Sequence, residues 1–373
     1  LLEAQRAFPF LTSSSSHAKM ILMNEEFDAQ AAARRLVRYW DRRRAMLGAV
    51  PGSDGDRRSG GNTDMVASFS RDCVEHPSDQ DMVRIVDEWD VDRLKKRHAR
   101  MDPVVQRRAL ACVKEWQSRR EAEMDRELAK LSNAAKTAWN DARKTRPDLA
   151  DSSAHRSIFL RSVEYDPVLA ARRMVKYWEL KYRLFGKERA FGPVKVEDME
   201  DVDGCGEELH RGVFYLLPGT DEHGRTVLFL RADKLPASAE GLRRALKVIW
   251  FVLHSSLALR STWNAGAVLL IYVRGLSMHN LSMEFGSTVC PLLFDSVPIK
   301  IKAMHDLFPP RGAWFVQVAR PVFRWLIGRK ARARVVEHEG TKGGIEEVLQ
   351  ELVECGMREE NLPEVVGGTL DEE

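Results

Sequence analysis

The sequence has few cysteines, no long apolar segment and little net charge, and each shortage excludes a class of protein. The five cysteines are widely scattered and form no CxxC pair, so we expect reduced thiols in a cytosolic protein rather than a disulfide framework. The longest apolar stretches, 248–259 and 265–273, fall short of the roughly 18–20 clean apolar residues that a membrane-spanning helix needs. A formal charge of +3 over 373 residues indicates neither nucleic acid nor membrane by itself.

The sequence also lacks the common catalytic motifs. It contains no GxSxG elbow, no GxxxxGK[ST] loop, no HExxH pair and no GxGxxG fingerprint after a strand. His279, His305 and His338 fall near predicted strand ends, but none has a neighbour at metal-ligand spacing. We therefore expect no catalytic residues, no metal and no cofactor, and a protein that is not an enzyme.

One internal repeat stands out. Residues 25–48 align without gaps with residues 163–186, so that Asp28 matches Asp166 and Tyr39-Trp40 matches Tyr177-Trp178. Each copy has the pattern of an amphipathic helix that Asp opens and Gly closes. Because so short a helix cannot bury its own apolar face, each copy should dock on another element, and we expect the domain that follows to provide it.

Composition divides the chain further. Residues 79–150 are rich in Lys, Arg, Glu, Gln and Ala, which favours a solvated helical lobe over a nucleic-acid-binding helix, since acidic residues are interleaved throughout and no base-reading motif is present. The sequence starts at Leu1 rather than at a methionine, which fits a fragment and leaves an upstream targeting segment open. The predicted organisation is a partial helical repeat (1–50), a flexible linker (51–78), the charged helical region (79–150), N-terminal helices (151–192) and a C-terminal domain (193–373).

The C-terminal domain alternates strand and helix patterns. Residues 211–219 and 225–235 predict two strands in a hairpin, with Gly224 in the turn. An unbroken apolar run at 265–273 predicts a strand buried on both faces. Further strands are predicted at 298–305 and 333–338, and helices at 239–261, 281–296, 312–328 and 343–356. This order predicts an α/β three-layer sandwich around a mixed, largely parallel sheet.

Two features suggest a function. Residues 312–328 are apolar on nearly every face, which fits either a central core helix or a lid between a lipid pocket and a bilayer. Basic residues surround this segment, and across 299–334 Asp306 is the only acid. The basic residues could form a solvated face, but their density favours contact with an anionic membrane. The set comprises Lys300, Lys302, Arg320, Arg324, Arg329, Lys330, Arg332 and Arg334.

The order of these pieces resembles the CRAL-TRIO lipid-binding and lipid-transfer family. The resemblance rests on FLRSVEYDPVLAARRMVKYWELKYRLFG (159–186), DEHGRTVLFLRADKL (221–235), LLIYVRGLSM (269–278) and LPEVVGGTL (362–370). It implies a mixed-sheet sandwich that encloses one lipid beneath a mobile gate helix, which residues 312–328 match.

Within that family, PIKIKAMH (298–305) is most similar to the tocopherol-transfer and retinaldehyde-binding branch. The phosphatidylinositol-transfer branch has a headgroup-binding Glu where Ile299 stands, so the resemblance disfavours phosphatidylinositol. Lys302, Lys330, Arg332 and Arg334 fall where the tocopherol branch has basic residues that contact phosphoinositides.

We therefore expect a cytoplasmic, peripheral membrane protein that binds one hydrophobic small molecule or lipid and exchanges it at anionic membranes. The alternative is a protein-interaction or membrane-tethering adaptor without lipid transfer. Ligand identity and oligomeric state stay open, and no nucleic-acid partner is expected. Tyr272 or Ser287 could orient the ligand, and Lys300, Lys302, Lys330, Arg332 and Arg334 are the predicted membrane contacts. The predicted pocket lining is Phe229, Trp250, Leu253, Leu270, Tyr272, Phe285, Leu293, Phe315 and Phe323.

Overall fold

The computed structural model describes only part of the chain. The described residues are 103–201, 203–274, 283–309, 320, 324, 331–339 and 344–371. The first copy of the repeat, the 51–78 linker and most of the 312–328 helix lie outside them, as do Phe315, Phe323 and Lys330. Among the described residues, every helix is too short or too polar to cross a membrane.

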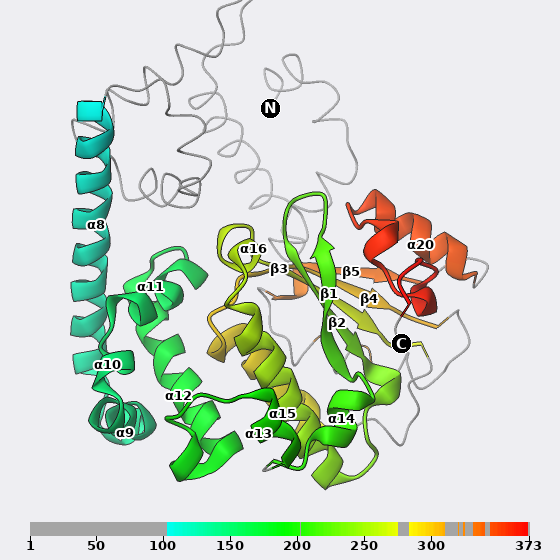
Figure 1. Cartoon of the computed structure of the whole chain (residues 1–373), viewed down its shortest axis with the longest axis horizontal. Helices are drawn as coiled ribbons and strands as arrows, with labels where there is room; N and C mark the ends of the chain where they lie inside the picture. The colour runs from blue at the N-terminus through cyan, green and yellow to red at the C-terminus, as the bar shows by residue number, and fades with distance from the viewer. Residues whose placement is uncertain are drawn as a thin grey trace, which may run out of the picture. The chain divides into compact units, whose positions relative to one another are not determined.

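A five-stranded sheet forms the centre of the C-terminal domain (Figure 1). Its spatial order is β1-β2-β3-β4-β5; β1 is antiparallel to β2, and the other neighbouring pairs are parallel. The predicted mixed, largely parallel α/β sheet is therefore confirmed. The strands are β1 (Phe214–Thr220), β2 (Thr226–Arg231), β3 (Ala267–Tyr272), β4 (Ile301–Leu307) and β5 (Val335–His338).

The predicted hairpin joins β1 to β2. The carboxylate of Asp221 accepts hydrogen bonds from the backbone N–H groups of His223 (3.0 Å) and Arg225 (2.8 Å). Gly224 has a φ of 73°, in the left-handed region that glycine adopts without strain. This side-chain-stabilised turn is what the sequence DEHG favours.

Helices cover both faces of the sheet. Alternate strand residues point to opposite sides, so the two faces carry different side chains. On one face Leu228, Leu269 and Met304 pack with α15 (Ala239–Ser256) and α17 (Met283–Pro291), and we call this cluster the larger core. On the other face Phe229 and Leu270 pack with α20 (Ile345–Glu354), and we call this cluster the smaller core. The remaining C-terminal elements are α13 (Val196–Asp201), α14 (Gly206–His210), η2 (Ala232–Lys234), α16 (Arg260–Asn264), η4 (Leu292–Ser296), α20 (Ile345–Glu354), η5 (Glu359–Asn361) and η6 (Glu364–Val366).

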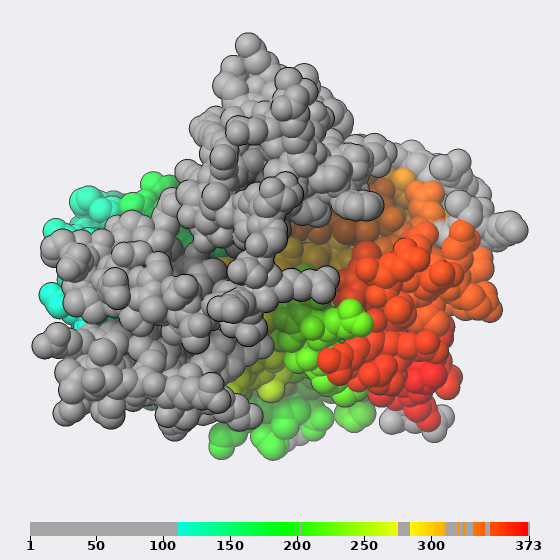
Figure 2. Space-filling model, turned by 90° about the horizontal axis from the view of Figure 1, so that it is seen from above, coloured from blue at the N-terminus to red at the C-terminus, as the bar shows by residue number. Residues whose placement is uncertain are grey.

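The C-terminal segment folds back onto the first hairpin. The Glu222 N–H donates to the Gly356 carbonyl at 2.9 Å, and the Asn361 side chain donates to the Thr220 carbonyl at 3.3 Å. In Figure 2 the orange and red C-terminal residues lie against the green residues of the hairpin. The smaller core is therefore enclosed by described residues.

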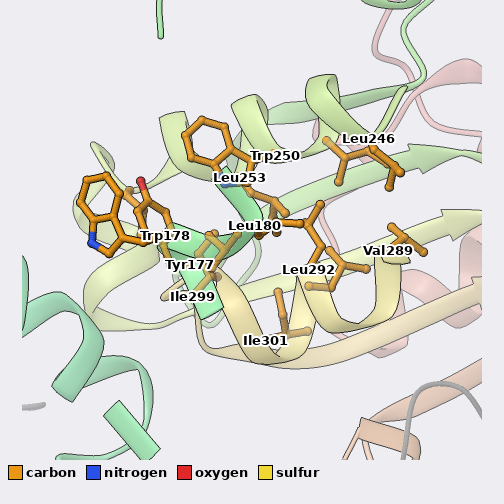
Figure 3. Packing of buried hydrophobic residues seen from close by; sticks show 14 of the residues in the cluster. Tyr177, Trp178, Leu180, Leu246, Trp250, Leu253, Val289, Leu292, Ile299 and Ile301 are labelled. Atoms are coloured by element: carbon orange, nitrogen blue, oxygen red, sulfur yellow. The ribbon is translucent and has the colours of Figure 1, made fainter. Parts of the chain in front are cut away.

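The second copy of the repeat forms α12 (Pro167–Arg189). The Asp166 carboxylate accepts a hydrogen bond from the Leu169 N–H at 3.0 Å, and Gly186 interrupts the helix with a φ of 74°. Its apolar face is buried: Trp178 is fully enclosed, and the Tyr177 ring lies 5.8 Å from the ring of Trp250 in α15 (Figure 3). This copy therefore docks on the domain that follows, as the sequence predicts. The other N-terminal elements are α8 (Pro103–Lys130), η1 (Ala134–Lys136), α9 (Thr137–Thr145), α10 (Pro147–Ala150) and α11 (Ser153–Ser162).

Two predicted strands begin later than their apolar patterns. β4 starts at Ile301 rather than at 298, because Pro298 has no N–H and the Ile299 N–H bonds back to the Val297 carbonyl at 2.8 Å. β5 starts at Val335, since residues 331 and 332 are helical and a turn follows. The predicted helix over 239–261 is also divided: α15 ends at Ser256 and α16 follows.

Candidate functional site

The sheet face in the larger core presents an apolar row that crosses four strands. Leu228 pairs with Leu269, Leu269 with Met304, and Met304 with Val335. The first three side chains are buried, whereas Val335 on the outer strand is half-buried. The row thus forms a continuous apolar floor, and its β5 end is not fully covered.

The next row on the same face, toward the carboxyl ends of the strands, becomes polar. It runs from Leu230 to Ile271, then to Asp306 and Glu337. Two carboxylates therefore stand side by side at the edge of an apolar floor. Apolar surface with a few convergent polar groups, at the carboxyl ends of parallel strands, is the usual setting of a ligand site in an α/β domain.

The Asp306 carboxyl has an unusual environment. Burial, followed by the nearby charge of Glu337, raises its pKa to about 7, although Arg324 and Arg320 oppose the shift. Its Oδ1 atom is buried, and no group among the described residues hydrogen-bonds to it. Near neutral pH this carboxyl can therefore hold a proton and either donate or accept a hydrogen bond with a polar group of a ligand.

Two arginines cover the carboxylate row. Arg320 Nη2 lies 2.5 Å from Glu339 Oε1, and its guanidinium stacks 4.1 Å from the Phe308 ring centroid. Arg324 Nη2 lies 2.5 Å from Glu337 Oε1. Both arginines belong to the basic set of the sequence, and carboxylates at the end of β5 compensate their charges.

The predicted pocket lining is divided between the two faces. Trp250, Leu253, Phe285 and Leu293 belong to the larger core, from α15, α17 and η4. By contrast, Phe229, Leu270 and Tyr272 point to the smaller core under α20. The seven described residues therefore do not line one pocket, and those of the larger core are the ones near the apolar floor.

The two polar candidates for orienting a ligand also lie away from the floor. Ser287 is exposed and donates to the Glu284 carbonyl at 2.8 Å. The Tyr272 ring lies 5.1 Å from the Arg231 guanidinium, on the smaller-core side. Asp306, which the sequence offered only as a lone acid among basic residues, is the better placed polar group.

The described residues also line two hollows away from the floor. The larger, of about 640 Å³, lies beside α9, between Asn133 and Asp151. The smaller, of about 20 Å³, lies between Trp263 and Lys300. Neither contains a residue of the predicted lipid pocket.

The predicted basic residues gather at the amino ends of β4 and β5. Lys300 Nζ lies 2.9 Å from Glu164 Oε1, and Arg334 donates to the Ile301 carbonyl at 2.6 Å. Lys300, followed by Lys302 and Arg334, lowers the pKa of the Glu164 carboxyl. Lys302, Arg332 and Arg334 are exposed. The grouping of Lys300, Lys302 and Arg334 follows the prediction, but the partly compensating acid, Glu164, comes from the turn before α12 and was missed.

Two histidines that the sequence treated as isolated lie together on the smaller-core face. His305 Nδ1 is 3.0 Å from His338 Nε2, although the residues are 33 positions apart in the chain. Because neither histidine has a neighbour at ligand spacing along the sequence, this pairing was not predicted. The signal was the polar His that each of the neighbouring strands β4 and β5 carries near its end.

Helices on both faces of a mixed sheet, with an apolar floor and a polar edge, define an α/β domain suited to a hydrophobic ligand. Residues 210–368 match the family model for the CRAL/TRIO domain, so this part of the chain is similar to that family. Over 157 residues the chain is 28% identical to the Mus musculus protein named "Alpha-tocopherol transfer protein-like". The match covers 41% of this chain and 43% of that relative, so the chain spans less than half of the relative's length. The predicted family and branch are confirmed.

Proposed function

We propose that the CRAL/TRIO domain holds one hydrophobic small molecule or lipid against the apolar floor and exchanges it at anionic membranes. The observation that carries the proposal is the Leu228–Leu269–Met304–Val335 row, which is apolar throughout and incompletely covered at β5. On the other face, Phe229 and Leu270 are fully buried and pack with α20 and the C-terminal segment. The name of the mouse relative supports a transfer role.

Apolar burial supplies most of the affinity in this proposal. Each Å² of apolar surface removed from water contributes about 25 cal/mol, so a small lipid needs few polar contacts. The protonatable Asp306 carboxyl provides one such contact at the edge of the floor. Ile299 is buried in the larger core and cannot accept hydrogen bonds from inositol hydroxyls, which favours a less polar ligand.

The basic residues at the amino ends of β4 and β5 serve as the membrane contact. A Lys or Arg near an anionic surface contributes about 1 kcal/mol of binding free energy. Lys302, Arg332 and Arg334 are exposed members of this set. Lys330 belongs to the same proposed contact by its position in the sequence.

Native mass spectrometry of the purified full chain tests the ligand. A carrier should retain one lipid-sized mass per chain, which is lost on collisional activation. A stable protein without a bound mass, after expression in cells and after incubation with mixed lipid vesicles, contradicts the carrier and favours the adaptor.

Vesicle sedimentation tests the membrane contact. The double substitution Lys302→Glu and Arg332→Glu should weaken binding to vesicles containing anionic lipid by at least tenfold, and raised salt should weaken wild-type binding. Lys187→Glu, at an exposed lysine beyond the α12 kink, is the matched control. Binding that ignores both salt and the double reversal would contradict the membrane role.

A further inference from the structure

On the sheet face opposite the apolar floor, three metal-ligating side chains from three elements converge. His305 comes from β4, His338 from β5, and Cys355 follows the last residue of α20. Each offers one ligand atom, and these atoms all lie within 4.8 Å of one another. Both histidines are 2% exposed, and Cys355 is half-buried. We propose that His305, His338 and Cys355 form a binding site for one zinc ion.

The spacing suits a metal ion. Zinc binds imidazole nitrogen at about 2.0 Å and thiolate sulfur at about 2.3 Å, so two of its ligand atoms stand roughly 3–4 Å apart. His305 Nδ1 and His338 Nε2 are 3.0 Å apart, and the two rings stack with centroids at 5.2 Å. Small side-chain rotations are therefore enough to bring the ligand atoms into zinc geometry.

The surroundings orient one ligand in the way metal sites require. His338 Nδ1 lies 2.8 Å from Glu351 Oε2, one turn before Cys355 on the same helix. A carboxylate that accepts the second ring N–H of a histidine fixes the tautomer and leaves the other nitrogen to bind the metal. His338 Nε2, the nitrogen facing His305, is then the metal-binding atom.

His305 supplies an independent observation. Its Nε2 atom is buried, and no described residue offers it a hydrogen bond. A buried polar atom without a partner is rare in folded proteins and calls for an explanation. The described residues therefore leave one nitrogen of the histidine pair unsatisfied, and rotation of the His305 ring can present that nitrogen to a bound cation.

The ligand types select the metal. Two imidazoles and a thiolate favour zinc over calcium or magnesium, which prefer oxygen ligands. On binding, the Cys355 thiol releases its proton to solvent, and the metal takes the place of that proton on the sulfur. Three protein ligands leave one position for a water molecule. The ion would join two strands to α20 and thereby fix the C-terminal segment on the sheet.

Zinc titration of the full chain, after chelator treatment and in competition with a chromophoric chelator, tests the site. We expect one tight zinc ion per chain and a higher Tm when zinc is present. Cys355→Ser should weaken zinc affinity at least tenfold. Cys112→Ser, at another half-buried free cysteine, is the matched control and should leave affinity unchanged.

Cobalt provides a readout that a merely structural effect would not move. Co²⁺ bound to the wild-type chain should show a thiolate-to-metal charge-transfer band, which Cys355→Ser removes and Cys112→Ser retains. Glu351→Gln should keep the band while weakening zinc affinity about tenfold to a hundredfold. Absence of tight zinc binding to the wild type, or a band that survives Cys355→Ser, overturns the proposal.

The zinc site and the lipid site stand or fall separately, because they lie on opposite faces of the sheet. Circular dichroism in the presence of chelator establishes that each variant is folded before its affinity is compared. If a variant does not fold, the wild-type stoichiometry and cobalt spectrum still decide whether a thiolate-containing site exists.

Discussion

The ammonium group of Lys300 and the carboxylate of Glu164 form an ion pair, with 2.9 Å between Nζ and Oε1. Lys300 precedes β4, whereas Glu164 lies in the turn between α11 and α12. The pair therefore links the repeated helical element to the proposed membrane contact. The negative charge of Glu164 also lowers the net positive charge of that contact. Lys302 and Arg334, like Lys300, lower the pKa of this carboxyl.

Neutralising Glu164 should strengthen membrane binding. Glu164→Gln removes one negative charge from the basic group, which at about 1 kcal/mol per charge near the surface predicts several-fold tighter binding to anionic vesicles. Vesicle sedimentation at two salt concentrations measures the effect. Glu188→Gln, at an exposed acid after the kink in α12, is the control and should leave vesicle binding unchanged. Equal affinities for Glu164→Gln and wild type would show that this end of the sheet does not meet the membrane.

Filling the floor at β5 should exclude the ligand. Val335 is half-buried on the larger-core face, and Val336, its neighbour, points to the opposite face and is 41% exposed. Val335→Trp should reduce copurifying lipid several-fold, because the indole occupies the end of the apolar row. Val336→Trp adds the same group outside the proposed site and should retain the lipid. The ratio of bound to empty protein in native mass spectra measures both, and equal lipid retention in the two variants would contradict this location.

Asp306 should make the stability of the domain depend on pH near neutrality. The folded-state pKa of about 7 lies above the unfolded value of 3.8, so the folded chain binds the extra proton between these pH values. The contribution to stability is present below pH 4 and is lost as the pH rises toward 7. At about 1.4 kcal/mol per pKa unit, the free energy of unfolding of Asp306→Asn should exceed that of wild type by up to a few kcal/mol at the upper end of this range. Urea unfolding at pH 5 and pH 7.5 measures it, and a difference that does not grow with pH contradicts the raised pKa.

The sequence predicts which helices and strands form better than it predicts which face of the sheet their residues contact. The hairpin and the caps of α12 follow from local signals, namely the Asp221–Gly224 turn, Asp166 and Gly186. Strands buried on both faces carry no alternation of apolar and polar residues, so Phe229 and Trp250 look equally suited to one pocket. Only the sheet shows that they pack on opposite sides.

Contacts between distant residues also escape the sequence. His305 meets His338 because β4 and β5 pair in parallel, in a register that pairs Leu307 with His338. Glu164 reaches Lys300 because its backbone, with a φ of 58°, turns the chain before α12. Strand register and a left-handed turn at a non-glycine residue leave no pattern in a single sequence.

The closing LPEVVGGTL segment depends on one glycine. A Cβ atom on Gly368 would lie 2.0 Å from the Leu362 carbonyl oxygen, in the segment where Pro363 pairs with Leu370. Gly368→Ala should therefore destabilise the domain by about 2–4 kcal/mol, as strained backbone substitutions do. Gly206→Ala, where a Cβ meets no atom within 4 Å, is the control. Thermal unfolding measures both, and a Gly368→Ala variant as stable as wild type contradicts the close approach.

The buried His155 and the half-buried His254, between α11, α12 and α15, should make the domain sensitive to acid. The Tyr177 hydroxyl lies 3.2 Å from His254 Nδ1, and the His155 ring packs against Tyr177 with centroids 6.1 Å apart. Burial lowers the pKa of both histidines to about 4; the charge of His254 further lowers that of His155, and Lys181 lowers both.

Because both histidines are uncharged in the folded chain, the unfolded chain takes up more protons below pH 6.5. The contribution of the two histidines to the free energy of unfolding is fully present above that pH and is lost as the pH falls from 6.5 to about 4. The loss is at most roughly 1.4 kcal/mol per pH unit for each histidine. His254→Gln should reduce this slope, whereas His210→Gln, at an exposed position, should leave it unchanged. Urea unfolding between pH 4.5 and 7.5 measures the slopes. Carboxylates titrate in the same range, so the comparison rests on the difference between the two variants, and identical slopes would contradict burial of His254 in its neutral form.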